Sequence, residues 1–170
     1  QPTVTEAELS ASEYFERGFG YAEAGEYDKA LVDFNEAIRL NPQFALAYYN
    51  RGVVYSKKAQ FANAISDYDE AIRLNPQDAL VYNNRGNAYN NIQDYTRAIS
   101  DLNMAIRLNP QYARAYLNRG IAYSHKGDNQ QAIADYDEAI RLNPQYTLAY
   151  NNRGYQHLYQ KRYKLALRDF

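Results

Sequence analysis

The chain has 170 residues, of which 46% are hydrophobic and 23% are charged, and its formal net charge is -1 at pH 7. A chain so close to neutrality is not a general binder of polyanions, so nucleic acid is not an expected partner. It contains no cysteine, which excludes disulfides and thiolate chemistry, and no apolar run approaches the ~18 residues of a membrane span.

Residues 1–10 are interpreted as an N-terminal lead-in or cap. Pro2 cannot lie inside a helix, whereas Thr5 followed by Glu8 fits a capping box. A first helix is therefore expected to begin near Glu6.

After this lead-in, the sequence Arg-Leu-Asn-Pro-Gln recurs every 34 residues. A fixed period of this size is typical of stacked repeat proteins. Within each copy, Arg is expected in a last helical turn, Asn in the left-handed conformation that ends a helix, and Pro in the first turn of the next helix. The period divides the chain into five repeats, the last incomplete, with positions called places 1 to 34: residues 11–44, 45–78, 79–112, 113–146 and 147–170.

Small and aromatic residues recur at fixed places in these repeats. Tyr occupies place 4, Gly place 8 and Ala place 20 of all five. Places 4, 8 and 11 share one helical face, as do places 17, 20, 21, 24, 27 and 28. Each repeat is therefore predicted to form two antiparallel helices, A and B, joined by a short turn at places 14 and 15. Gly25 and Gly127 mark this turn, but Ala59 and Gln93 replace them elsewhere, so the turn does not strictly require glycine.

The recurring residues resemble the tetratricopeptide repeat family over residues 11–170. The matching places are Tyr at 4, Gly at 8, Tyr at 11, Ala at 20, an aromatic residue at 24, Ala at 27 and Pro at 32. This resemblance implies an all-α fold, a right-handed superhelical solenoid of antiparallel helix pairs.

One departure from the family pattern is systematic. Place 7, usually Leu in the family, is Arg in all five repeats, and place 23 is always Asp. We expect each Arg to lay its stem along the packed face and to pair with an Asp at place 23 of its own or a neighbouring repeat.

The resemblance also implies a concave groove, lined by the A helices, that holds an extended peptide or a partner helix. The groove places are where the repeats differ most. The predicted groove residues are Tyr49, Asn50, Val53, Asn83, Asn84, Asn87, Asn90, Asn91, Arg114, Leu117, Asn118, Ile121, Asn151, Asn152 and Tyr155.

Asparagine recurs at place 6 of this groove, at residues 50, 84, 118 and 152. An Asn side chain both donates and accepts, so it can bond a peptide backbone without regard to sequence. The pattern is similar to the asparagine ladder that lines the repeats of O-linked N-acetylglucosamine transferase. Alanine at Asn50, Asn84, Asn87 and Asn118 is then expected to abolish binding without loss of stability. The alternative is that these asparagines drifted on an exposed surface.

Other sites are less well supported by the sequence. Chaperone adaptors of this family use three cations in a carboxylate clamp, and Asn83, Leu148 and Asn152 stand at those places, so an acidic chaperone-type ligand is not expected. His125 and His157 are isolated in the sequence, without cysteine or a Gly-rich phosphate loop. No enzyme activity, cofactor or metal is therefore predicted.

The leading function is a protein-protein interaction scaffold, in an unassigned compartment with the cytoplasm slightly favoured. One alternative is a regulatory or substrate-recruiting domain cut from a larger enzyme. The other is a structural array that associates head to tail, because residues 1–44 hold nine acidic and three basic groups, whereas residues 147–170 hold one and five. Because the fifth repeat stops at Phe170, inside its B helix, we expect further repeats or a capping helix in a longer chain.

Overall fold

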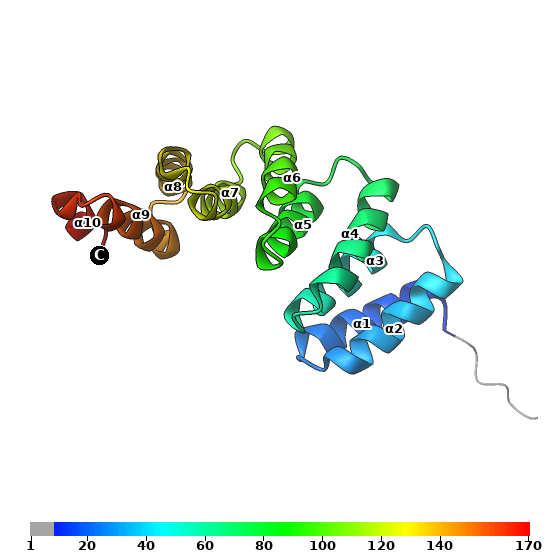
Figure 1. Cartoon of the computed structure of the whole chain (residues 1–170). Helices are drawn as coiled ribbons and strands as arrows, with labels where there is room; N and C mark the ends of the chain where they lie inside the picture. Colours follow the sequence, from blue (N-terminus) through cyan, green and yellow to red (C-terminus); the bar gives the residue numbers. More distant parts are fainter. Residues whose placement is uncertain (1–8) are drawn as a thin grey trace, which may run out of the picture. The chain divides into compact units, whose positions relative to one another are not determined.

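The computed structural model of the chain describes residues 9–170, which form ten helices and no strand (Figure 1). The capping box expected at Thr5 and Glu8 lies outside these residues. Helix α1 (Ala11–Glu23) begins instead after Ser10, whose hydroxyl accepts from the Glu13 amide over 3.3 Å, while the Glu13 carboxylate accepts from the Ser10 amide over 2.8 Å. The backbone hydrogen bond from Ser10 lowers the pKa of Glu13 below its usual value.

The helices fall into two compact units. The first ends at Pro76 and the second begins at Gln77. The first holds α1, α2 (Tyr27–Leu40), α3 (Ala45–Lys57) and α4 (Phe61–Leu74). The second holds α5 (Ala79–Asn91), α6 (Tyr95–Leu108), α7 (Ala113–His125), α8 (Asn129–Leu142), α9 (Thr147–Tyr159) and α10 (Tyr163–Asp169).

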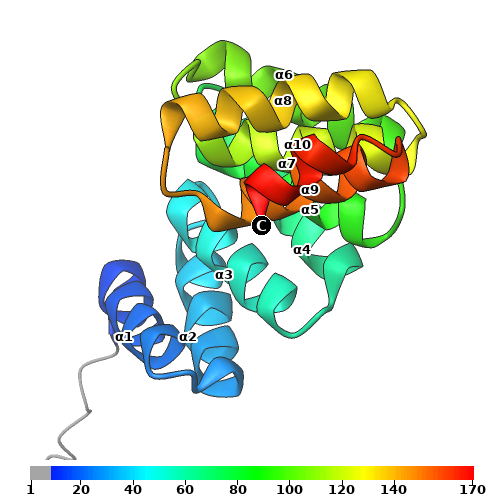
Figure 2. The same ribbon diagram turned by 90° about the vertical axis from the view of Figure 1, so that its left-hand side faces the viewer.

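An A helix and the B helix that follows it pack together in every repeat, as the two helices α9 and α10 do in both views (Figure 1 and Figure 2). In the four complete repeats, the core of each pair consists of alanines on the B helix and one large side chain at place 24. In α8, for example, Ala132, Tyr136 and Ala139 are at most 2% exposed. The predicted division of each repeat into two antiparallel helices is confirmed.

The Asn-Pro segment ends the B helices in a different way from the one expected. Asn41 has φ -135° and ψ 90°, which is extended rather than left-handed backbone. The reason is that a residue before proline is pushed out of helical conformations. The Asn41 side chain then accepts from the Gln43 amide over 3.1 Å. Pro42 lies in this turn and not in the next helix, which begins at Ala45.

The turn between the A and B helices has left-handed backbone at place 15 of every repeat. Gly25 and Gly127 have φ of 75° and 81°, and Ala59, Gln93 and Lys161 have φ between 57° and 63°. Glycine is therefore not strictly required, as expected, although a residue with a Cβ pays ~1–2 kcal/mol in this conformation.

The Arg and Asp that recur at places 7 and 23 pair within each repeat, which confirms the expected ion pairs. Nε and Nη2 of Arg119 donate to the two carboxylate oxygens of Asp135 over 2.8 and 2.6 Å. Nη1 of Arg119 also donates to Asn103 of the preceding repeat over 2.6 Å, so the same side chain links neighbouring repeats. The five pairs are Arg17–Asp33, Arg51–Asp67, Arg85–Asp101, Arg119–Asp135 and Arg153–Asp169.

The aspartates of these pairs are buried. Asp135 is 4% exposed, and burial raises the pKa of its carboxyl above the usual value, while the hydrogen bonds from Arg119 act against that rise. The pKa of Asp67 is raised for the same reason. The positive charge of the arginine at place 7 therefore offsets the cost of burying the carboxylate at place 23.

Candidate functional site

The most concentrated group of predicted groove residues lies on the second compact unit, where α5, α7 and the start of α9 border an open pocket of about 370 Å³. We call it the asparagine pocket. It is lined by Asn83, Asn84, Asn87, Arg114, Leu117, Asn118, Tyr146 and Leu148.

Two of the predicted groove asparagines are buried, and one of them, Asn118, belongs to the ladder predicted at place 6. Asn83 is 1% exposed and Asn118 is 8% exposed. Nδ2 of Asn118 donates to Oδ1 of Asn83 over 3.0 Å, and Nδ2 of Asn83 donates to Oδ1 of Asn84 over 3.1 Å. With Leu117, which is also buried, these side chains form the floor of the pocket and join α5 to α7.

This burial corrects the expectation that alanine at position 118 leaves stability unchanged. Removing the Asn118 amide would leave the buried oxygen of Asn83 without its donor, which costs ~1–3 kcal/mol. Nδ2 of Asn90 also donates to the backbone carbonyl of Asn118 over 2.9 Å. Part of the asparagine pattern is therefore structural.

The exposed rim of the asparagine pocket carries the groups that a ligand can reach. Asn87 is exposed, and its side chain makes no hydrogen bond within residues 9–170. Arg114 is exposed and forms no ion pair within the same residues. None of the eight lining residues is acidic. The rim therefore offers amide groups and one cation.

The remaining predicted residues of the second compact unit lie outside this lining. Asn91 donates to the backbone carbonyl of Asn87 on its own helix over 2.8 Å. Ile121, Asn151 and Asn152 are half-buried on α7 and α9. Tyr155 borders a different cavity, which is described below.

The predicted residues of the first compact unit all lie on α3. Tyr49, Asn50 and Val53 are half-buried there. Nδ2 of Asn50 donates to the backbone carbonyl of Leu46, one turn earlier, over 2.8 Å, so this hydrogen bond lies within α3.

Besides Leu148, Tyr146 is a lining residue that is not among the predicted groove residues. It stands at place 34, the last position before an A helix. Aromatic residues occupy this place in three of the four complete repeats, as Phe44, Tyr112 and Tyr146. That recurrence was the available signal.

Among the described residues there is no group of three or more His, Cys, Asp or Glu side chains that could hold a metal. His125 is exposed and stacks on Tyr95, with ring centroids 4.9 Å apart, whereas His157 is 8% exposed in the core. Within residues 9–170, none of the helices has the length and hydrophobicity that crossing a membrane requires.

The paired helices, their repeating core and their recurring ion pairs define an all-α helical repeat solenoid. Sequence profiles described as "TPR repeat" match residues 20–59 and 86–127. Profiles described as "Tetratricopeptide repeat" match residues 45–78, 113–146 and 67–100. The chain belongs to the tetratricopeptide repeat family. No curated protein matches it.

Solved structures show the same fold. A crystal structure of MamA is 25% identical, with a TM-score of 0.83 and 90% of each chain covered. YrrB, titled a TPR protein with an unusual peptide-binding site, is 22% identical with a TM-score of 0.78, covering 94% of this chain and 82% of its own; at that identity it supports the fold alone. The first TPR of Spaghetti (RPAP3), bound to the HSP90 peptide SRMEEVD, is 28% identical with a TM-score of 0.68, covering 70% of this chain and 94% of its own.

Proposed function

We propose that the chain is a non-catalytic interaction scaffold that holds an extended polypeptide against the asparagine pocket. The observation that carries the proposal is the pocket itself, in which amide side chains and one cation line the surface of α5, α7 and α9 without a carboxylate. Because amides both donate and accept, they suit the alternating donors and acceptors of a peptide backbone. Members of this family are generally scaffolds rather than enzymes, and we extend that role to this chain.

The related structure that binds SRMEEVD gives support for a peptide ligand but not for the same peptide. That peptide is acidic, and a carboxylate ligand calls for cations. Arg114 is the only Lys or Arg among the lining residues of the asparagine pocket. We therefore expect recognition to depend mainly on backbone hydrogen bonds and little on acidic side chains.

The test uses a ten-residue peptide selected for binding from a random library. The double variant Asn84→Ala and Asn87→Ala is expected to bind this peptide ~5- to ~140-fold more weakly, because two hydrogen bonds that contribute ~0.5–1.5 kcal/mol each are lost. The melting temperature is expected to fall, because the buried Nδ2 of Asn83 loses Oδ1 of Asn84 as its acceptor, so the affinities are compared at a temperature where both proteins are folded. Fluorescence anisotropy gives the affinity.

Asn91→Ala serves as the matched control, because Asn91 is exposed on the same helix and does not line the pocket. It should retain the wild-type affinity. Full affinity in the Asn84/Asn87 double variant would contradict the proposal, and so would equal losses in the double variant and the control.

A second candidate function is self-association through the end formed by α9 and α10. Phe170 and Leu167 are 63% and 80% exposed, whereas Tyr136, which stands at the place of Phe170 one repeat earlier, is 2% exposed. Residues 147–170 are basic and residues 1–44 acidic. A second copy could supply the covering surface, with the charges orienting the encounter.

Sedimentation across protein concentration tests this candidate. End-to-end association is expected to grow with concentration, to weaken with salt, and to fall when Lys161, Arg162 and Lys164 become Glu. A strictly monomeric species at high concentration and low salt would contradict it.

A further inference from the structure

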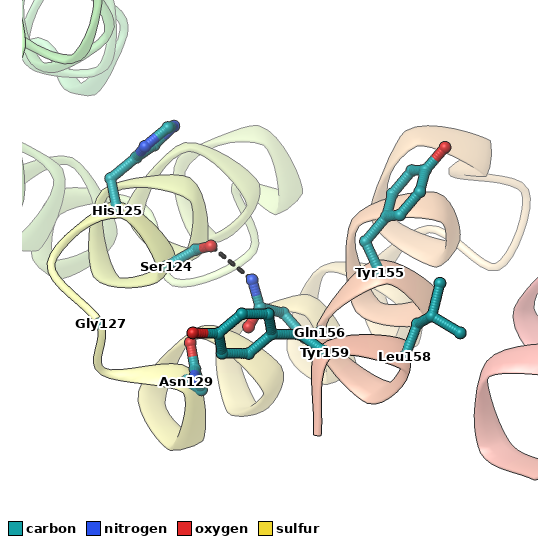
Figure 3. A pocket seen from close by; sticks show the side chains of 8 residues that line it. All are labelled: Ser124, His125, Gly127, Asn129, Tyr155, Gln156, Leu158 and Tyr159. Atoms are coloured by element: carbon teal, nitrogen blue, oxygen red, sulfur yellow. Dashed lines mark hydrogen bonds between the residues drawn. The ribbon is translucent and has the colours of Figure 1, made fainter. Parts of the chain in front are cut away.

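A second, larger pocket, which is also open to solvent, lies between α7 and α9, at the opposite end of these helices from the asparagine pocket. Its volume is about 740 Å³, within the range of small-molecule sites. We call it the tyrosine cavity. Figure 3 shows Gln156 reaching from α9 to bond Ser124 on α7, with Tyr155 and Leu158 on the α9 side. Its lining includes Ser124, His125, Asn129, Tyr155, Leu158 and Tyr159.

The cavity stands where the fourth repeat lacks an aromatic residue. Place 17, the first position of each B helix, is aromatic in the other four repeats and Asn129 in the fourth. The aromatic residues at this place are half-buried in the first three repeats. The four aromatic residues at place 17 are Tyr27, Phe61, Tyr95 and Tyr163.

The preceding junction shows what an aromatic ring does at this place. Tyr95, at place 17 of the third repeat, stacks on His125, at place 13 of the fourth, with ring centroids 4.9 Å apart and planes 3° apart. The corresponding residues one repeat later are Asn129 and Tyr159, and both line the tyrosine cavity. Tyr159 thus occupies the place of His125 but has no ring at place 17 to stack upon, and it is 79% exposed.

The chemistry of the lining selects the occupant. No Asp, Glu, Lys or Arg borders the cavity, so an uncharged group is favoured. Tyr155 and Leu158 are 63% and 44% exposed and supply apolar contact area. Oε1 of Gln156, which is buried without a hydrogen-bond partner among the described residues, and the Asn129 amide can accept from a phenol O–H or an indole N–H. An aromatic ring of a ligand bound here would take the position that the aromatic residue at place 17 occupies in other repeats.

We propose that the tyrosine cavity is an anchor pocket for a Tyr or Trp side chain of the bound polypeptide, which takes the position of the missing aromatic residue at place 17 and stacks on Tyr159. The proposal rests on the proposed function, because the ring belongs to the polypeptide held at the asparagine pocket. Leu148 and Tyr159, one from each site, are 11 positions apart on α9, or ~16 Å at ~1.5 Å per residue. An extended ligand covers that span in ~5 residues.

The test exploits the absence of tryptophan from the chain, because the fluorescence of a Trp probe then has no background. Three probes are titrated: N-acetyltryptophanamide, a ten-residue Gly/Ser peptide carrying Trp at one end, and its counterpart with Ala in place of Trp. The Trp peptide is expected to bind at least ~10-fold more tightly than the Ala peptide, as for burial of one large aromatic side chain. This ratio should be insensitive to salt, because no charged side chain borders the cavity.

The decisive variant is Asn129→Tyr, which restores the aromatic residue of the other repeats. It is expected to raise the melting temperature by filling the cavity and to reduce the advantage of Trp over Ala to less than about twofold. Gln131→Tyr adds the same side chain at an exposed position of α8 outside the lining and should keep the wild-type ratio.

The probes separate this inference from the proposed function. One outcome is that N-acetyltryptophanamide binds the wild type but not Asn129→Tyr, with no gain in affinity when the probe is extended to the Trp peptide. This result would support the anchor pocket and contradict the peptide groove. If the Trp and Ala peptides bind equally well, the groove stands and the anchor pocket is overturned. An unchanged Trp advantage in Asn129→Tyr overturns it as well, and failure of all three probes to bind contradicts both.

Discussion

Replacing Arg119 with Met is expected to lower the free energy of unfolding by ~3–5 kcal/mol, the cost of leaving a buried charge unpaired. Asp135 is 4% exposed and receives two hydrogen bonds from Arg119. Met preserves much of the apolar stem of Arg119, so the loss measures the charge rather than the packing. Urea denaturation of the wild type and the variant gives the difference.

Two controls separate pairing from packing. The double variant Arg119→Met and Asp135→Leu removes both charges, and most of the lost stability should return, because a buried ion pair is often replaceable by apolar residues. Arg141→Met removes an arginine that is 62% exposed and pairs with Glu138 on the helix surface, so little change is expected. Equal losses in Arg119→Met and the double variant would contradict this explanation.

The loss in free energy of unfolding caused by Arg119→Met should also depend on pH. Burial raises the pKa of the Asp135 carboxyl, and without Arg119 nothing opposes that rise. A carboxyl with a raised folded-state pKa favours the folded state at low pH, and this contribution is lost as the pH rises through that pKa. The deficit relative to the wild type is therefore expected to shrink between neutral and acidic pH, and a deficit independent of pH would argue against a buried carboxylate.

Replacing Gly120 with Ala is expected to cost ~1–3 kcal/mol, because the added methyl group overpacks the junction of α7 and α8. A Cβ at this position would lie 2.6 Å from Cε1 of Tyr136 and 3.2 Å from the carbonyl oxygen of Ala132. The Tyr136 ring is 2% exposed and cannot move aside without disturbing the core. Thermal or urea denaturation measures the loss.

Gly20→Ala provides the opposite expectation in the same kind of helix. A Cβ on Gly20 would meet nothing within 4 Å, so alanine should raise stability by up to ~1 kcal/mol through its better helix propensity. Opposite signs for the two substitutions support the close approach of the A and B helices at place 8. Stabilisation by both would contradict it.

Much of the fold could be predicted from the sequence because the same residue types recur at the same places of successive repeats. Glycine recurs at place 8 in every repeat, and the structure shows that a Cβ added at that place would crowd the residue at place 24. The pairing of Arg119 with Asp135 was inferred from two residue types that are constant together. The left-handed conformation expected for Asn41 was wrong, because the restriction from the following proline outweighs the tolerance of Asn for that region.

The candidate site was harder to predict, because its burial depends on contacts between repeats that differ. Place 5 is Phe15, Tyr49 and Leu117 in three repeats and Asn in the other two. Asn83 is buried whereas Asn151 is half-buried, and the residue type at this place does not predict that difference. The partner of Asn83, Asn118, belongs to the next repeat, 35 residues away, and only the structure brings the two amides to 3.0 Å. The tyrosine cavity could not be predicted for a related reason, since it lies where Asn129 replaces the aromatic residue of the other repeats.

Whether a polypeptide lies against the asparagine pocket can be read from the side-chain amide spectrum of ¹⁵N-labelled protein. The spectrum is recorded during titration with the selected ten-residue peptide, and the signals of Asn84 and Asn87 are assigned from the alanine variants. Both signals are expected to shift with saturation at one affinity. The signal of Asn143, whose side chain bonds Gln145 in a turn, should not move. Unmoved Asn84 and Asn87 signals at a peptide concentration that saturates the protein would contradict the proposal that a polypeptide lies there.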